Sequence, residues 1–73
     1  MEDLCPNAVG KSSWPELLHV QGHVAAAVIA RENPKVSVAI VKEGSIVTMD
    51  IRCDRVRVWV DKHGIVNSVP HIG

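Results

Sequence analysis

The sequence contains no phenylalanine and no tyrosine, and two tryptophans are its only aromatic residues. Any hydrophobic core must therefore be built from valine, isoleucine, leucine and alanine. No run approaches the roughly 20 apolar residues that a membrane-spanning helix needs. The formal net charge is zero, so the charge balance points neither to nucleic acid nor to a membrane surface as partner. At 73 residues the chain makes a single domain with a small core.

The residue patterns of catalytic, metal and cofactor sites are also missing. The four histidines (His19, His23, His63 and His71) lack ligand spacing with a cysteine, so we expect no metal and interpret them as surface residues. No Ser-His-Asp arrangement, carboxylate pair or phosphate-binding glycine loop can be assembled, which predicts that the protein is not an enzyme and needs no cofactor. Interleaved aspartates and the lack of stacking aromatics disfavour a nucleic-acid site in "RCDRVRVWV".

The N-terminal half predicts an arm and one helix. Residues 1–13 carry turn formers and no basic start followed by an apolar run, so no signal peptide is visible, and the compartment (cytoplasmic, vacuolar or extracellular) stays open. "WPELL" suits a single helical turn with Trp14 and Leu17 toward the core. "HVAAAVIAREN", 23–33, has apolar spacing typical of an amphipathic helix, with Gln21 or Gly22 as N-cap and Pro34 as the stop.

Three later segments predict strands. The β-branched run 36–41 is typical of a strand buried on both faces, often a parallel one. Residues 54–60 alternate, with valines 56, 58 and 60 toward the core and Arg55, Arg57 and Trp59 on the other face. Residues 65–70 predict a short last strand, antiparallel to the second. The sequence therefore predicts an α+β fold, with one helix packed on a small sheet.

The segment between the first two strands is too long for a hairpin turn and too short for a helical crossover. Its stiff β-branched residues favour an extended loop that is held in place. The guanidinium groups of Arg55 and Arg57 are suited to bond the loop carbonyls, the Thr48 hydroxyl and the Asp50 carboxylate, which leaves Met49 at an exposed tip. A solvated arginine face with Met49 as a stray apolar residue is the alternative that the residues alone leave open.

The motifs "WPELL", "EGSIVTMD" and "RCDRVRVWVD", followed by "VPHIG", resemble the potato inhibitor I family of serine protease inhibitors over residues 14–73. The resemblance implies a helix on a mixed sheet with two parallel main strands. It makes Met49–Asp50 the reactive-site bond of a loop spanning about 43–53, in an inhibitor domain preceded by the arm 1–13. The chain departs from the family pattern at His19 and Val20, and at His71, which replaces a common arginine.

The resemblance also implies roles for the residues around that bond. The protease would contact Ser45, Ile46, Val47, Thr48, Ile51 and Arg52. The loop would be supported by Arg55, Arg57 and Gly73. Cys5 and Cys53 would form a disulfide as in two-cysteine members, whereas the composition alone leaves a bridge and two thiols equally open.

These roles predict a monomeric inhibitor that acts by the substrate-like standard mechanism. The long apolar side chain of Met49 fits the primary pocket of chymotrypsin-like and subtilisin-like enzymes. It has no charge for the aspartate of a trypsin pocket, so we expect weak trypsin inhibition. A non-inhibitory protein-binding module on the same scaffold is the alternative function.

Overall fold

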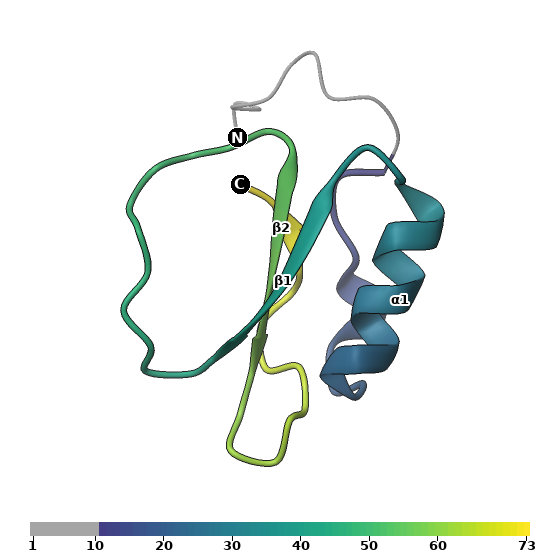
Figure 1. Ribbon diagram of the computed structural model, residues 1–73. Helices are drawn as coiled ribbons and strands as arrows, with labels where there is room; N and C mark the ends of the chain where they lie inside the picture. Colours follow the sequence, from purple (N-terminus) through teal and green to yellow (C-terminus); the bar gives the residue numbers. More distant parts are fainter. Residues whose placement is uncertain (1–10) are drawn as a thin grey trace.

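The computed structural model describes residues 11–73, which form one helix and a small sheet (Figure 1). The elements in chain order are the 3₁₀ helix η1 (Pro15–Leu17), the α-helix α1 (Gly22–Glu32) and the strands β1 (Ser37–Lys42), β2 (Arg55–Val60) and β3 (His71–Ile72). α1 contacts β1 and β2, and the long loop between these strands arches away on the side opposite the helix. The expected α+β class is confirmed.

The sheet is mixed, with the strand order β1-β2-β3. β1 runs parallel to β2 in a register that pairs Ser37 with Arg55 and Lys42 with Val60. β3 pairs antiparallel with the start of β2, where His71 lies opposite Arg57. β2 is therefore the central strand, with a named strand on each side, and the sheet is organised around it.

The two helical segments form where the sequence predicts them. Pro15 opens η1 at a position where its missing N–H costs nothing, and Trp14 and Leu17 are buried. α1 begins after Gln21, which makes no side-chain capping bond, and ends before Asn33 and Pro34. The helix bounds differ from the predicted 23–33 by one residue at each end.

The core lies between the helical layer and the inner face of β2. Its fully or nearly buried members are Trp14, Leu17, Ala25, Ile29, Val56, Val58, Val60 and Val66. Gly22 lets α1 approach β2 closely, because a Cβ added there would lie 2.7 Å from Cγ1 of Val60. The core is aliphatic apart from Trp14, as the composition requires.

The prediction that residues 36–41 are buried on both faces is wrong. β1 is an edge strand, and Ile40 is half exposed. Val36 and Val38 pack against the core, whereas Ser37 and Ala39 on the opposite face are exposed. A β-branched run satisfies the extended backbone of an edge strand as well as that of a buried one, so the pattern could not distinguish them.

The last strand lies later in the chain than predicted. Within 65–70 the structure has only single bridges, from Ile65 to Gln21 and from Val66 to Val60, and the ladder resumes at His71 and Ile72. Val66 pairs with Val60, and Ile72 pairs with Val56. The C-terminal segment therefore uses six residues to pass along four residues of β2. The segment between these two pairings thus bulges out of the ladder.

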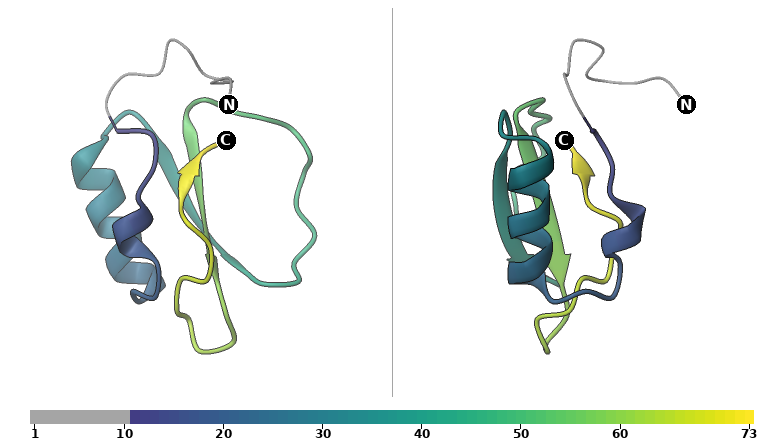
Figure 2. Two further views of the ribbon diagram at one scale, coloured as in Figure 1. Left: turned by 180° about the vertical axis from the view of Figure 1, so that it is seen from behind. Right: turned by 90° about the vertical axis from the view of Figure 1, so that its right-hand side faces the viewer.

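The side view in Figure 2 places α1 beside β1 and the segment that contains η1 beside the C-terminal segment that ends in β3. Ser13 bridges His71, and the Ile72 N–H donates to the carbonyl oxygen of Ser12 at 3.0 Å, so residues just before η1 run along β3. The rest of the predicted arm, 1–10, lies outside the described residues. No helix in 11–73 is long and apolar enough to span a membrane.

Candidate functional site: an extended loop on two arginines

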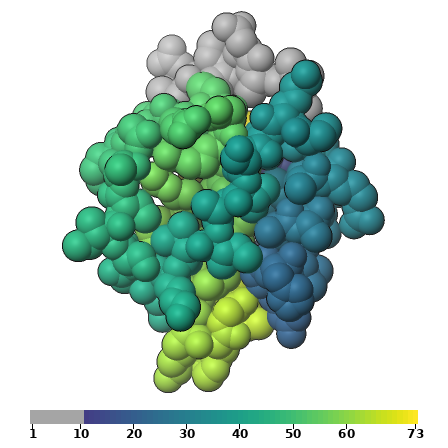
Figure 3. All heavy atoms as spheres, in the orientation of Figure 1, coloured from purple at the N-terminus to yellow at the C-terminus, as the bar shows by residue number. Residues whose placement is uncertain are grey.

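The loop between β1 and β2 leaves the sheet at Glu43, whose N–H donates to Val60, and turns at Gly44. Among the described residues, 46–52 take part in no backbone–backbone hydrogen bond. The side chains of Ile46 and Met49 are 100% and 95% exposed. The loop forms the left margin of the molecule in Figure 3. Its extended shape must therefore be maintained by side chains from elsewhere.

Arg55 joins the loop to the end of the chain. Its Nη2 donates to the Asp50 carbonyl oxygen at 2.9 Å, and its Nε donates to the Gly73 carbonyl oxygen at 2.9 Å. Its Nη1 lies 3.4 and 3.5 Å from the two carboxylate oxygens of Asp50. The Gly73 N–H in turn donates to the Arg55 carbonyl oxygen at 2.9 Å. One guanidinium thus bonds both the backbone and the side chain of Asp50.

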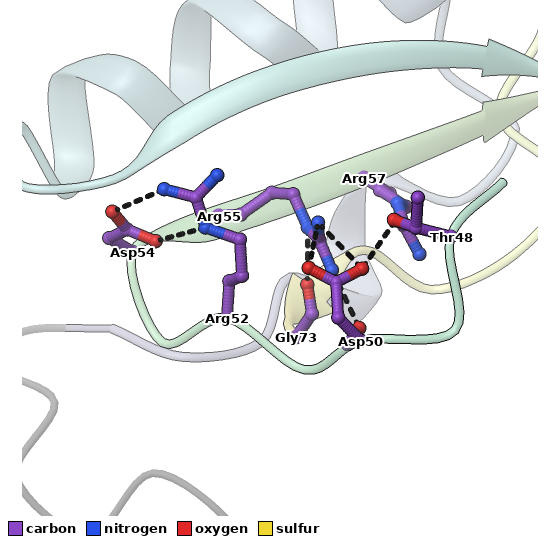
Figure 4. A network of polar contacts seen from close by, with 7 residues as sticks. All are labelled: Thr48, Asp50, Arg52, Asp54, Arg55, Arg57 and Gly73. Carbon is purple, nitrogen blue, oxygen red and sulfur yellow. Dashed lines mark hydrogen bonds and ion pairs between the residues drawn. The ribbon is translucent and has the colours of Figure 1, made fainter.

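Arg57 stands two residues further along the same face of β2 and holds the other side of the loop tip. Its Nη2 donates to the Thr48 hydroxyl at 2.9 Å and lies 3.7 Å from the Asp50 carboxylate (Figure 4). The side chains of Arg55 and Arg57 are only 13% and 19% exposed, beneath a loop that is itself exposed. The two residues that flank Met49 are thus both tied to β2.

The Asp50 carboxylate is stabilised in its charged form. The pKa of Asp50 is lowered, first by the hydrogen bond from the Thr48 hydroxyl and further by the positive charge of Arg55, and together these effects outweigh the desolvation of the carboxylate, which raises the pKa. Because this carboxylate is well exposed, water weakens each of these contacts. The network therefore positions the loop more than it stabilises the fold.

Arg52 does not join this network. Its guanidinium forms a two-pronged pair with the Asp54 carboxylate, at 3.2 and 3.1 Å, and both side chains are more than half exposed. The remaining predicted contact residues lie along the loop with Ser45, Ile46 and Ile51 exposed and Val47 half-buried. Cys53 occupies the turn that leads into β2, and its predicted partner Cys5 lies outside the described residues.

Between the outer face of β2 and the C-terminal segment there is a cavity of about 250 Å³ that the sequence did not suggest. It is lined by Arg57, Trp59, Ser68, Val69, His71 and Gly73. It forms where the returning chain bulges out of the ladder, beside the outer face of β2. Asn67 and Ser68 interrupt the apolar run of 65–70, which is a sequence signal for this bulge.

The model of the "Potato inhibitor I family" matches residues 6–73. The chain belongs to the potato inhibitor I family. Members of this family are protease inhibitors and not enzymes, and the present chain is one of them. Within residues 11–73, His, Cys, Asp and Glu side chains form no group of three that could hold a metal.

Relatives in this family are similar over nearly their whole length. An "Inhibitor of trypsin and hageman factor" from Cucurbita maxima is 56% identical over 94% of this chain and 97% of its own. A "Glu S.griseus protease inhibitor" from Momordica charantia is 59% identical over 88% of this chain and 94% of its own. The crystal structure of bitter gourd trypsin inhibitor superposes with a TM-score of 0.88 at 57% identity, covering 90% of this chain and 97% of that one.

His19, where the chain departs from the family pattern, has an unusual backbone conformation. His19 adopts φ 72°, in the left-handed region that few non-glycine residues enter, between η1 and α1. Its N–H donates to the Val66 carbonyl oxygen at 2.9 Å, and Val66 donates back to Val20 at 2.8 Å. These two bonds dock the turn onto the segment after β2 and maintain the unfavourable backbone angle.

Proposed function

We propose that the chain inhibits chymotrypsin-like and subtilisin-like serine proteases by the substrate-like standard mechanism, as a monomer, with Met49–Asp50 as the reactive bond. The observation that carries this proposal is the arrangement around Met49. Its two neighbours are bonded to arginines of β2, while its own side chain projects into solvent. Such an arrangement presents one peptide bond and one anchor side chain in a fixed, extended form.

The hydrogen bonds from Arg55 and Arg57 tether the loop to β2. This tether contributes to affinity without contacting the enzyme. A serine protease binds its substrate as an added extended strand, with main-chain hydrogen bonds on each side of the scissile bond. A flexible peptide loses conformational freedom on binding, whereas a loop already held extended avoids much of that cost. Among the described residues, 46–52 make no backbone–backbone hydrogen bond, so most of their N–H and C=O groups remain open to the enzyme, the exception being the Asp50 carbonyl oxygen that accepts from Arg55.

The same contacts account for inhibition in place of digestion. When the protease serine attacks the Met49 carbonyl, the departing amine is that of Asp50. Arg55 bonds both the carbonyl oxygen and the carboxylate of Asp50, so this amine stays next to the acyl group after cleavage. Its high effective concentration favours religation over attack by water. The inhibitor therefore needs no catalytic group of its own.

Met49 sets the target in this proposal. The names of the two relatives refer to different proteases, although each relative shares more than half of its aligned residues with this chain. Target choice therefore varies on one scaffold, as expected if few loop residues determine it. An unbranched apolar side chain at 95% exposure suits a deep apolar pocket and leaves the aspartate of a trypsin pocket unpaired.

The proposal is tested by titrating fixed amounts of chymotrypsin, subtilisin and trypsin with the protein and following residual activity. We expect stoichiometric loss of chymotrypsin and subtilisin activity, with trypsin spared. Mass spectrometry of long-incubated complexes should find Met49–Asp50 as the one hydrolysed bond. Strong trypsin inhibition with cleavage after Arg52 would move the reactive bond and refute the assignment of Met49.

We also propose that Cys5 and Cys53 form a disulfide. Its support is the position of Cys53, in the turn where the loop rejoins β2, together with the bridge found in two-cysteine members of the family. A link closing such a long loop contributes roughly 4 kcal/mol in the chain-entropy model. Alkylation of the unfolded, unreduced protein should label neither cysteine, and labelling of both would disprove the bridge.

A further inference from the structure

The exposed side chain at the tip of the loop carries an oxidisable thioether. The sequence has two methionines, and Met1 lies outside the described residues. Met49 is 95% exposed, whereas the oxidisable indole of Trp14 is fully buried and that of Trp59 is half-buried. A thioether in this position meets dissolved oxidants without any opening of the fold.

We infer that Met49 is a reversible oxidation site at which oxidation weakens inhibition. A peroxide transfers one oxygen to the thioether: the sulfur lone pair forms the S–O bond, the O–O bond breaks, and the peroxide is reduced to water or an alcohol. The product is methionine sulfoxide. A thiol-dependent sulfoxide reductase reverses the step by oxidising two thiols to a disulfide and releasing the oxygen as water.

Oxidation of Met49 should weaken protease binding because its side chain moves from water into an apolar pocket of the protease. In the free protein, water solvates the sulfoxide oxygen, so oxidation at a 95% exposed position leaves the fold and the arginine contacts in place. In the complex, the same oxygen enters an apolar pocket and loses its hydrogen bonds to water. Burying an unpaired polar group of this kind raises the inhibition constant about 10- to 100-fold.

This inference rests on the proposed role of Met49 as anchor, so its test needs a variant that keeps the anchor and lacks the sulfur. Met49→Leu has a similar volume and polarity. It also retains Met1, both cysteines and both tryptophans, which makes it a control for oxidation at every other residue. Parent and variant are treated with dilute hydrogen peroxide, and inhibition constants for chymotrypsin and subtilisin are measured before treatment, after treatment and after incubation with sulfoxide reductase.

We expect the treated parent to gain one oxygen at Met49, to lose affinity 10- to 100-fold, and to recover it with the reductase, while Met49→Leu stays unchanged. An unchanged constant for the oxidised parent would overturn the inference, as would an equal loss in both proteins or peptide mapping that finds Met49 unmodified. If neither untreated protein inhibits either enzyme, the proposed function itself fails, which is distinct from failure of the oxidation step alone.

Discussion

The two faces of β2 differ in both chemistry and burial. Val56, Val58 and Val60 point inward and are almost completely buried, whereas Arg55 and Arg57 point outward beneath the loop. The inner face contacts apolar side chains of the core, which favours folding through the hydrophobic effect. The outer face makes hydrogen bonds to exposed partners, which contribute little to folding but restrict the loop.

Because side chains alternate along β2, the residues that stabilise the fold and the residues that hold the loop lie on opposite faces of the same strand. Residues that differ by one position in the sequence lie on opposite faces, so a substitution on one face should leave the property of the other face largely intact. Substitutions on the inner face should therefore change stability, and substitutions on the outer face or in the loop should change inhibition.

Met49→Lys should change the target and leave the fold intact. The ammonium would pair with the aspartate in a trypsin pocket, so we expect affinity for trypsin to rise on the order of 100- to 1,000-fold and affinity for chymotrypsin to fall. Inhibition assays measure both, and the thermal midpoint should stay unchanged. Ile46→Lys adds the same charge at an equally exposed loop position, and an equal gain there would show that Met49 is not the anchor.

Val58→Ala should affect stability alone. It removes two methyl groups from a fully buried position, so we expect a loss of about 2–3 kcal/mol in the free energy of unfolding, measured with urea. The inhibition constant should stay within a factor of two or so at a temperature where the protein remains folded. Val24→Ala makes the same change at an exposed helix position. Equal destabilisation by both variants would contradict the core assignment.

Arg57→Ala should affect inhibition and leave stability nearly unchanged. Losing the bond to Thr48 frees the loop, so we expect the inhibition constant to rise roughly 10-fold and hydrolysis of Met49–Asp50 to accelerate, with a small change in stability. Timed mass spectrometry of the protease mixture measures the hydrolysis. Arg31→Ala, on the exposed last turn of α1, is the matched control. A variant cleaved no faster than the parent would refute the tether.

Lowering the pH should reduce the contribution of the Asp50 carboxylate to stability, and this effect should be the smallest of those predicted. The folded state lowers the pKa of Asp50 from 3.8, so its contribution to stability is present above that value and disappears as pH falls through the lower folded pKa. Unfolding experiments from pH 6 to pH 2 should therefore show Asp50→Asn slightly less stable than the parent at pH 6 and equal to it at the acid end. A constant difference across this range would rule out the carboxylate as the titrating group.

Much of this arrangement could be predicted from local patterns. Pro15 and Pro34 bracket the helical region, the alternation of 54–60 identifies the two faces of β2, and the turn-poor segment before it indicates an extended loop. The position of β3 could not be predicted, because the valines of 65–70 suit a strand but the ladder resumes only at His71. The cavity beside Trp59 depends on that shift and was equally hidden.

The sequence by itself determined the helix, the faces of β2 and a loop that carries Met49 between two residues able to bond arginine, because these follow from spacing within one segment. The tertiary structure alone decided that β1 is an edge strand with an exposed face, that the chain bulges between Val66 and His71, and that one guanidinium joins Asp50 to Gly73. These features depend on strand order and on contacts between distant segments, which no local pattern encodes.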